Sequence, residues 1–172
     1  ADETVGTTVS IVCVNSSGER SFLYNPGSAA AYTRENIDPR LMEECDIVFV
    51  AGAMLLTKFD GEPCAQFMKE ARSKGKFTVM DTAWDFDDVW MPKIQPVLPH
   101  LDLFMPSLEE AQKLTGETEP DRIADRFFEM GVANVRMDEH GYIYGEIPAN
   151  TEEKITSLGF IAHMDTSPAL SG

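Results

Sequence analysis

Short apolar runs alternate with amphipathic segments over residues 46–130, and this alternation constrains the fold more than any other feature of the sequence. Residues 46–51, 76–81 and 101–105 are brief apolar runs, which are typical of strands buried on both faces. Strands spaced by helices predict right-handed crossovers and a parallel sheet. We therefore expect a three-layer α/β core with about four or five mostly parallel strands.

Three segments between or after these runs have the spacing and the end signals of helices. In residues 61–74, apolar residues recur at i, i+3, i+4 and i+7, and Gly75 ends the pattern. Residues 108–114 and 120–130 are also predicted helices, and each is followed by a glycine.

Both ends of the chain are predicted to be rich in β-structure. Residues 7–14 and 19–24 flank a turn-forming stretch at 15–18, which indicates a hairpin. An isolated hairpin leaves exposed edges, so these strands are also a candidate contact with a second copy of the chain. After Val135 the alternation of strands and helices ends. Residues 142–144 and 158–162 are predicted strands with no helix between them.

Composition and charge exclude several classes of partner. The 172 residues are 43% hydrophobic and 25% charged, as in a globular domain. A formal charge of −15 repels phosphate backbones and anionic lipid surfaces, so we expect neither nucleic acid nor a membrane as partner. No stretch approaches the ~20 apolar residues of a membrane span, and the first eight residues do not resemble a signal peptide.

The cysteines indicate a reducing compartment. Cys13, Cys45 and Cys64 are odd in number and lack the C-x-x-C spacing. We expect buried structural thiols rather than a redox or metal site, and a cytoplasmic location.

Four ordered segments of residues 7–134 resemble the ribokinase-like (PfkB) family of carbohydrate kinases. They are the strand pair with its G-E-R turn and following small residues, DIVFVAG, GKFTVMDTAWD, and DLFMPSLEEAQKLTG. The resemblance implies a ribokinase-like fold in which a sugar hydroxyl attacks the γ-phosphoryl group of ATP with the help of Mg²⁺. A sugar and a nucleotide are the partners that it implies, and a homodimer through the lid-like strands.

The same resemblance assigns cofactor-binding roles to Asp81, Ser107 and Glu110. Glu110 corresponds to the Glu of the family's N-x-x-E segment, and Ser107 stands where Asn is usual. Ser107 and Glu110 also have the spacing of a capping box, so a purely structural role competes with metal binding. Asp81 ends a predicted strand at the carboxyl edge of the sheet, where it either faces the phosphates or caps the next turn.

Gly27, Ser28 and Ala29 match the small residues on the lid side of the family's sugar site. An ordinary turn explains them as well. Trp84, Phe86 and Trp90 are expected to be core or surface-packing aromatics rather than a platform for a nucleotide.

Two segments that the family uses for chemistry do not occur in this sequence. The G-A-G-D run that supplies the catalytic Asp is absent, and so is the Gly-Gly-Asn sugar-binding segment. No residue is therefore assigned as catalytic base. We expect this chain to lack kinase activity.

Residues 135–172 resemble peptidase T, a two-metal aminotripeptidase, through D-E-H-G-Y-x-Y-G and G-F-I-A-H-M-D-T-S-P. The resemblance makes His163 a zinc ligand and Asp165 the acid that orients its surroundings. The further ligands and the general base of that family have no counterpart here, so we expect no tight zinc site.

The two resemblances divide the chain into three parts. They are a lid-like β segment over residues 1–30, a partial ribokinase-like α/β domain over 31–134 and a peptidase T-like β fragment over 135–172. The leading hypothesis is a partial, inactive carbohydrate kinase. The alternatives are a fragment of a zinc-dependent aminotripeptidase and a non-enzymatic domain that binds a sugar, a nucleotide or itself.

Overall fold

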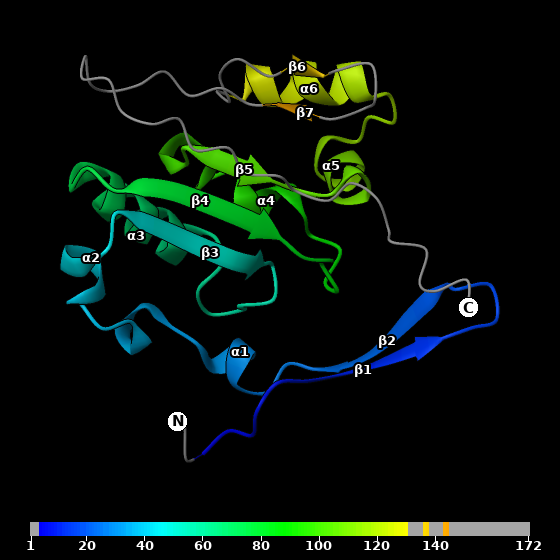
Figure 1. The fold of residues 1–172 in the computed structure, drawn as a ribbon, viewed down its shortest axis with the longest axis horizontal. Helices are drawn as coiled ribbons and strands as arrows, with labels where there is room; N and C mark the ends of the chain where they lie inside the picture. The colour runs from blue at the N-terminus through cyan, green and yellow to red at the C-terminus, as the bar shows by residue number, and fades with distance from the viewer. Residues whose placement is uncertain (1–3, 131–135, 138–142, 145–172) are drawn as a thin grey trace.

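The computed structural model describes residues 4–130, 136–137 and 143–144 (Figure 1). The predictions for His163, Asp165 and residues 158–162 concern positions outside these residues. Within them, no helix is both long and apolar enough to cross a membrane.

The predicted hairpin is confirmed and extends away from the rest of the molecule (Figure 1). Strands β1 (Val9–Val14) and β2 (Arg20–Asn25) pair antiparallel, with Ile11 opposite Leu23 and Val12 opposite Phe22. Both faces are open, since the large apolar side chains of the two strands are 49% to 65% exposed. Cys13 is exposed on the same hairpin, so its prediction as a buried thiol is wrong. A two-stranded ribbon without a covering layer cannot bury its side chains.

Three short helices connect the hairpin to the sheet. They are α1 (Ser28–Ala31), the 3-10 helix η1 (Arg34–Asn36) and α2 (Leu41–Glu44). Their apolar side chains contribute little to the core, and Met42 is the buried one among them.

A parallel sheet forms the centre of the molecule, as the alternation predicts. Its strands β3 (Ile47–Ala53), β4 (Phe77–Thr82) and β5 (Leu103–Met105) lie side by side in chain order. The described residues contribute three parallel strands to it, fewer than the four or five expected. A short antiparallel pair, β6 (Arg136–Met137) and β7 (Ile143–Tyr144), lies apart from this sheet.

The helices pack against the face of the sheet that carries Val48, Val50 and Met80 (Figure 1). All three predicted helices are present, and the core also includes residues of the short helices after β4. The helices are α3 (Glu62–Ser73), α4 (Met91–Ile94), the 3-10 helix η2 (Leu98–His100), α5 (Leu108–Thr115) and α6 (Pro120–Glu129).

Cys64 lies on the buried face of α3. It is 1% exposed, and burial raises the pKa of its thiol to about 12. This thiol is therefore a structural apolar group, as the sequence predicts.

Candidate active site at the carboxyl edge of the sheet

Asp81 and Ser107 lie at the same edge of the sheet because β4 and β5 are parallel. Asp81 is next to last in β4 and pairs in register with Met105, the last residue of β5. The chain continues from Met105 through Pro106 to Ser107, the N-cap of α5. This edge is where open α/β sheets bind ligands.

Glu110 is held in place by two elements. Its backbone N–H donates to Ser107 Oγ at 3.3 Å, and its Oε2 accepts from the backbone N–H of Ser107 at 2.9 Å. The predicted capping box is therefore confirmed. The same Oε2 also accepts from Thr82 Oγ1 at 2.7 Å, which ties α5 to the end of β4.

Sequence reasoning did not identify Thr82 as part of this site. Thr82 is 28 residues from Glu110, and a single threonine at the end of a strand matches no sequence motif. The feature that could have identified Thr82 is its position directly after Asp81, on the face of β4 that packs against the helices.

Asp81 and Glu110 place two carboxyl groups close enough to influence each other. Partial burial raises the pKa of Asp81, the charge of Glu110 raises it further, and the backbone N–H of Thr82 opposes both. Two carboxylates that repel each other in a half-buried site favour a bound cation, which would relieve the repulsion.

These donors fit Mg²⁺. That ion uses one or two carboxylates and completes its shell with water and substrate phosphates. The described residues hold no group of three or more His, Cys, Asp or Glu side chains that could bind a metal by themselves. A site built from Asp81 and Glu110 would therefore need a phosphate ligand to complete it.

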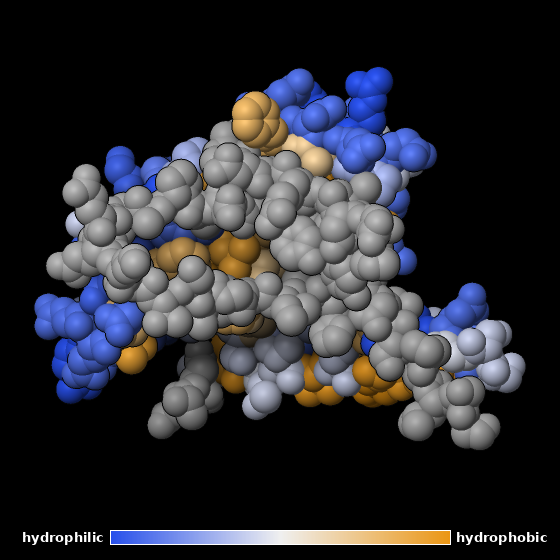
Figure 2. Space-filling view, turned by 45° about the horizontal axis from the view of Figure 1, so that its top comes forward, coloured by the Kyte–Doolittle hydropathy of each residue, from blue (hydrophilic) through white to orange (hydrophobic). Residues whose placement is uncertain are grey.

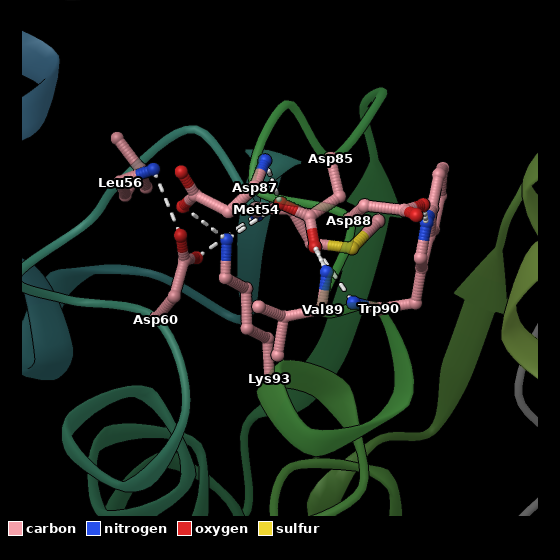
Figure 3. A network of polar contacts seen from close by, with 9 residues as sticks. All are labelled: Met54, Leu56, Asp60, Asp85, Asp87, Asp88, Val89, Trp90 and Lys93. Carbon is pink, nitrogen blue, oxygen red and sulfur yellow. Dashed lines mark hydrogen bonds and ion pairs between the residues drawn. The ribbon is translucent and has the colours of Figure 1, made fainter.

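A buried ion pair anchors the loop that follows Asp81 (Figure 3). The Asp85 side chain is fully buried and accepts hydrogen bonds from the backbone N–H of Val89 at 2.7 Å and of Trp90 at 2.6 Å. Lys93 Nζ donates to Asp85 Oδ1 at 2.6 Å and to Asp87 Oδ2 at 2.8 Å. Burial by itself raises the pKa of Asp85, but Lys93 and the backbone N–H groups outweigh burial and hold it below its ordinary value.

This ion pair stabilises an unusual backbone. Asp88 and Trp90 have φ angles of 54° and 58°, in the left-handed region that side chains with a Cβ rarely adopt. Asp85 binds the N–H of Trp90 directly, so the pair keeps the loop in this conformation.

Asp60 extends the network to the loop after β3. Its carboxylate accepts from the backbone N–H of Met54 at 3.0 Å and of Leu56 at 2.9 Å, and burial raises its pKa. In Figure 3, dashed lines join the ammonium of Lys93 to Asp85 and Asp87, while Asp60 binds the backbone of its own loop. The charge of Lys93 opposes the rise in the pKa of Asp60, so the two loops interact electrostatically.

The aromatic residues of this region pack against neighbouring groups, as predicted. Trp84 and Trp90 form an edge-to-face pair with ring centroids 4.9 Å apart, and Lys113 Nζ lies 5.6 Å from the Trp84 centroid. Phe86 stacks on Tyr24 of the hairpin at 5.3 Å, which connects the hairpin to the loop after β4.

Gly27, Ser28 and Ala29 lie apart from the carboxylate pair. A Cβ on Gly27 would lie 2.5 Å from the carbonyl oxygen of Gly6, and the φ angle of Gly27 is 46°. The turn interpretation therefore accounts for this glycine. Ser28 and Ala29 line a groove of about 640 Å³ beside β3, whose walls include neither Asp81 nor Glu110.

Comparisons with known proteins agree with this architecture. The sequence model of the pfkB family of carbohydrate kinases matches residues 1–157, a match that continues past Val135. The solved structure of a putative ribokinase II from E. coli, in complex with ATP and Mg²⁺, has a TM-score of 0.59 and 16% identity over 85% of this chain and 52% of its own. A ribokinase from Arabidopsis thaliana, complexed with ribose and ATP, has a TM-score of 0.56 and 18% identity over 86% of this chain and 51% of its own. The chain thus spans about half the length of these proteins.

A short segment is also similar to a second family. It is 48% identical over 50 residues to the peptidase T of Halothermothrix orenii, which is 29% of this chain and 12% of that protein. The resemblance to peptidase T is confirmed for a segment of this size.

Proposed function

Because the chain belongs to the pfkB family of carbohydrate kinases, we propose that it carries the phosphate- and Mg²⁺-binding part of a kinase that transfers a phosphoryl group from ATP to a sugar hydroxyl. The observation that carries the proposal is the convergence of Asp81, Thr82 and Glu110 at the carboxyl edge of the sheet. We propose that the chain binds Mg²⁺ with ATP and does not by itself catalyse transfer.

Each residue of the edge has a role in this proposal. Asp81 and Glu110 hold Mg²⁺ together with nucleotide phosphates, while Ser107 and Thr82 fix the carboxylate of Glu110. When bound, the ion neutralises charge on the transferred phosphoryl group. Ser28 and Ala29 border the sugar side, and Gly27 allows the close backbone approach beside them.

The proposed lack of turnover is supported by one feature of the sequence. The 172 residues contain no G-A-G-D run, and in this family the Asp of that run takes the proton from the sugar hydroxyl. Without a general base, the attacking oxygen keeps its proton.

The hairpin is proposed to cover the sugar and to form a homodimer. Tyr24 lies on the face of β2 that also carries Phe22, and its stacking on Phe86 turns this face toward the loop after β4. The other face presents Ile11 and Leu23, which are 55% and 65% exposed. Figure 2 shows hydrophobic side chains at the surface along the margin where the hairpin lies. The face that carries Ile11 and Leu23 is the proposed contact with a second copy. We also propose a cytoplasmic location for the chain.

We propose no peptidase activity for this chain. His163 and Asp165 supply one zinc ligand and one supporting acid by resemblance, and a catalytic zinc needs three protein ligands.

The test is titration calorimetry of the chain with ATP in the presence and absence of Mg²⁺. We expect Mg²⁺-dependent binding that Glu110→Gln weakens about tenfold, a change of about 1.4 kcal/mol. Glu109→Gln is the matched control, because Glu109 is exposed on the same turn of α5. Equal effects of the two substitutions, or ATP binding that does not depend on Mg²⁺, would contradict the proposed role of Glu110.

Turnover is tested separately with a panel of sugars. ATP consumption should stay at the background level with every sugar, since the 172 residues contain no G-A-G-D run to supply a general base. Sugar-dependent ATP hydrolysis or phosphorylation would show that another group takes the proton.

A further inference from the structure

Lys113 lies one helical turn after Glu110, on the same side of α5. Its Nζ is 5.6 Å from the ring centroid of Trp84 and 5.9 Å from that of Trp90. Thr82 contacts Glu110 at 2.7 Å, and Trp84 follows Thr82 by two residues. The end of β4 and the loop after it therefore contact α5 at two successive turns, first at Glu110 and then at Lys113.

The ammonium of Lys113 is available to a ligand. The side chain is 47% exposed, and its ion-pair partner Asp88 lies 3.8 Å away on a side chain that is 75% exposed. An exposed pair of this kind is weak. Lys93 differs, because its side chain is 17% exposed and its Nζ donates to Asp85 at 2.6 Å and to Asp87 at 2.8 Å. Of these two lysines, Lys113 is the one that can turn to a ligand.

The proposed Mg²⁺ site needs a further positive charge. Its residues are Asp81, Thr82, Ser107 and Glu110, and none of them is a cation. One Mg²⁺ offsets the charges of the two carboxylates and leaves the remaining charge of the nucleotide phosphates without a partner. The chain has a formal charge of −15, so its overall field also opposes a polyphosphate. A lysine supplies the missing positive charge as a point charge.

We propose that Lys113 binds a phosphate group of the nucleotide whose Mg²⁺ is held by Asp81 and Glu110, an inference that rests on the proposed function. Trp84 is 43% exposed, and its ring keeps the ammonium beside the end of β4 before a ligand binds. A charge-assisted hydrogen bond to phosphate then replaces this contact. A lysine in the last turn of a helix also complements the helix dipole, but that role affects stability and not ligand binding.

Calorimetric titrations of the full chain with MgATP and with magnesium tripolyphosphate test this contact. Lys113→Met should weaken the binding of both about tenfold, because the lost contact is to phosphate and not to the base. Lys113→Arg keeps the charge and should recover most of the affinity. Lys74→Met is the matched control, because it changes the net charge equally. Lys74 is 43% exposed, pairs with Glu70 and follows α3 near the start of β4, at the opposite end of that strand from the site.

Tryptophan fluorescence gives a second readout. The sequence has two tryptophans, Trp84 and Trp90, and both rings lie close to the ammonium of Lys113. Saturating MgATP should therefore change the fluorescence of the wild-type chain and of Lys74→Met. The change should be lost in Lys113→Met, where no ammonium leaves the rings. Equal changes in Lys113→Met and in the wild-type chain would contradict the inference.

The calorimetric outcomes are equally decisive. Equal affinities of the wild-type chain and Lys113→Met, equal losses in Lys113→Met and Lys74→Met, or a loss confined to ATP would overturn the inference. Glu110→Gln separates this failure from a failure of the proposed function. If Glu110→Gln weakens Mg²⁺-dependent ATP binding and Lys113→Met does not, the proposed Mg²⁺ site stands and Lys113 has no part in it. A wild-type chain that binds no ATP would overturn both.

Discussion

At the scale of single residues, Glu110 has a structural role and a proposed chemical one. Its Oε2 closes the capping box and accepts from Thr82, so the contacts that begin α5 also fix this carboxylate at the end of β4. The capping role therefore does not conflict with the proposed binding of Mg²⁺. A carboxylate held in this way would be in position before an ion binds.

Ser107→Ala tests the cap. Loss of the N-cap hydroxyl should lower the free energy of unfolding by about 1 kcal/mol, measured by urea denaturation. Ser21→Ala is the control, because Ser21 lies in exposed β2 and caps no helix. Equal stability of the two variants would mean that Ser107 contributes nothing as a cap.

Asp81 predicts a dependence of stability on pH. Its pKa is raised in the folded state, so the folded protein holds this proton more tightly than the unfolded chain does. The contribution of this proton to the free energy of unfolding is fully present below the ordinary pKa of an aspartate. It is lost as pH rises through the raised pKa of Asp81 in the folded protein.

Asp81→Asn should therefore stabilise the protein at pH 7, and the gain should shrink as pH falls toward the ordinary pKa of an aspartate. Thermal unfolding over a pH series measures the difference in Tm between the variant and the wild-type chain. A gain that is independent of pH would contradict the electrostatic cause. The same substitution should weaken Mg²⁺ binding, which distinguishes stability from function.

At the scale of elements, the carboxyl-edge loops are held by charge rather than by secondary structure. Lys93 of α4 binds Asp85 and Asp87 of the loop after β4, and its charge also acts on Asp60 of the loop after β3. Asp85 in turn holds the left-handed backbone at Trp90. The position of the loop that follows Asp81 therefore depends on one buried ion pair.

Lys93→Met should lower the free energy of unfolding by about 3–5 kcal/mol, because it leaves a buried carboxylate without its counter-charge. The double variant Lys93→Met/Asp85→Asn should recover part of this loss. Lys113→Met is the control, since Lys113 makes exposed contacts, and it should cost less than about 1 kcal/mol. Urea denaturation of the three variants measures their free energies of unfolding. Equal losses of stability in Lys93→Met and Lys113→Met would contradict a buried ion pair at Lys93.

At the scale of the whole molecule, the described chain exposes two apolar β surfaces, the outer face of the hairpin and the edge of β3. Surfaces of this kind mark interaction sites. The outer face of the hairpin is the surface that is proposed to meet a second copy.

Leu23→Asp tests the hairpin surface. It places a charge in the proposed contact between copies and should raise the dissociation constant of the dimer at least about tenfold by sedimentation. Leu23 is 65% exposed, so the fold of the monomer should persist. Leu41→Asp is the control at the other surface and should leave the dissociation constant of the dimer unchanged. A wild-type chain that stays monomeric would contradict the proposed dimer.

The sequence by itself determined the elements: period and end signals place the hairpin, the parallel strands, the helices and the capping box, because these depend on residues close together in the chain. Only the tertiary structure decided which distant groups meet. The contact of Thr82 with Glu110, the burial of the pair between Asp85 and Lys93, and the exposure of Cys13 all depend on packing between elements. A local pattern specifies which way a side chain points along its own strand or helix, but not what lies opposite it.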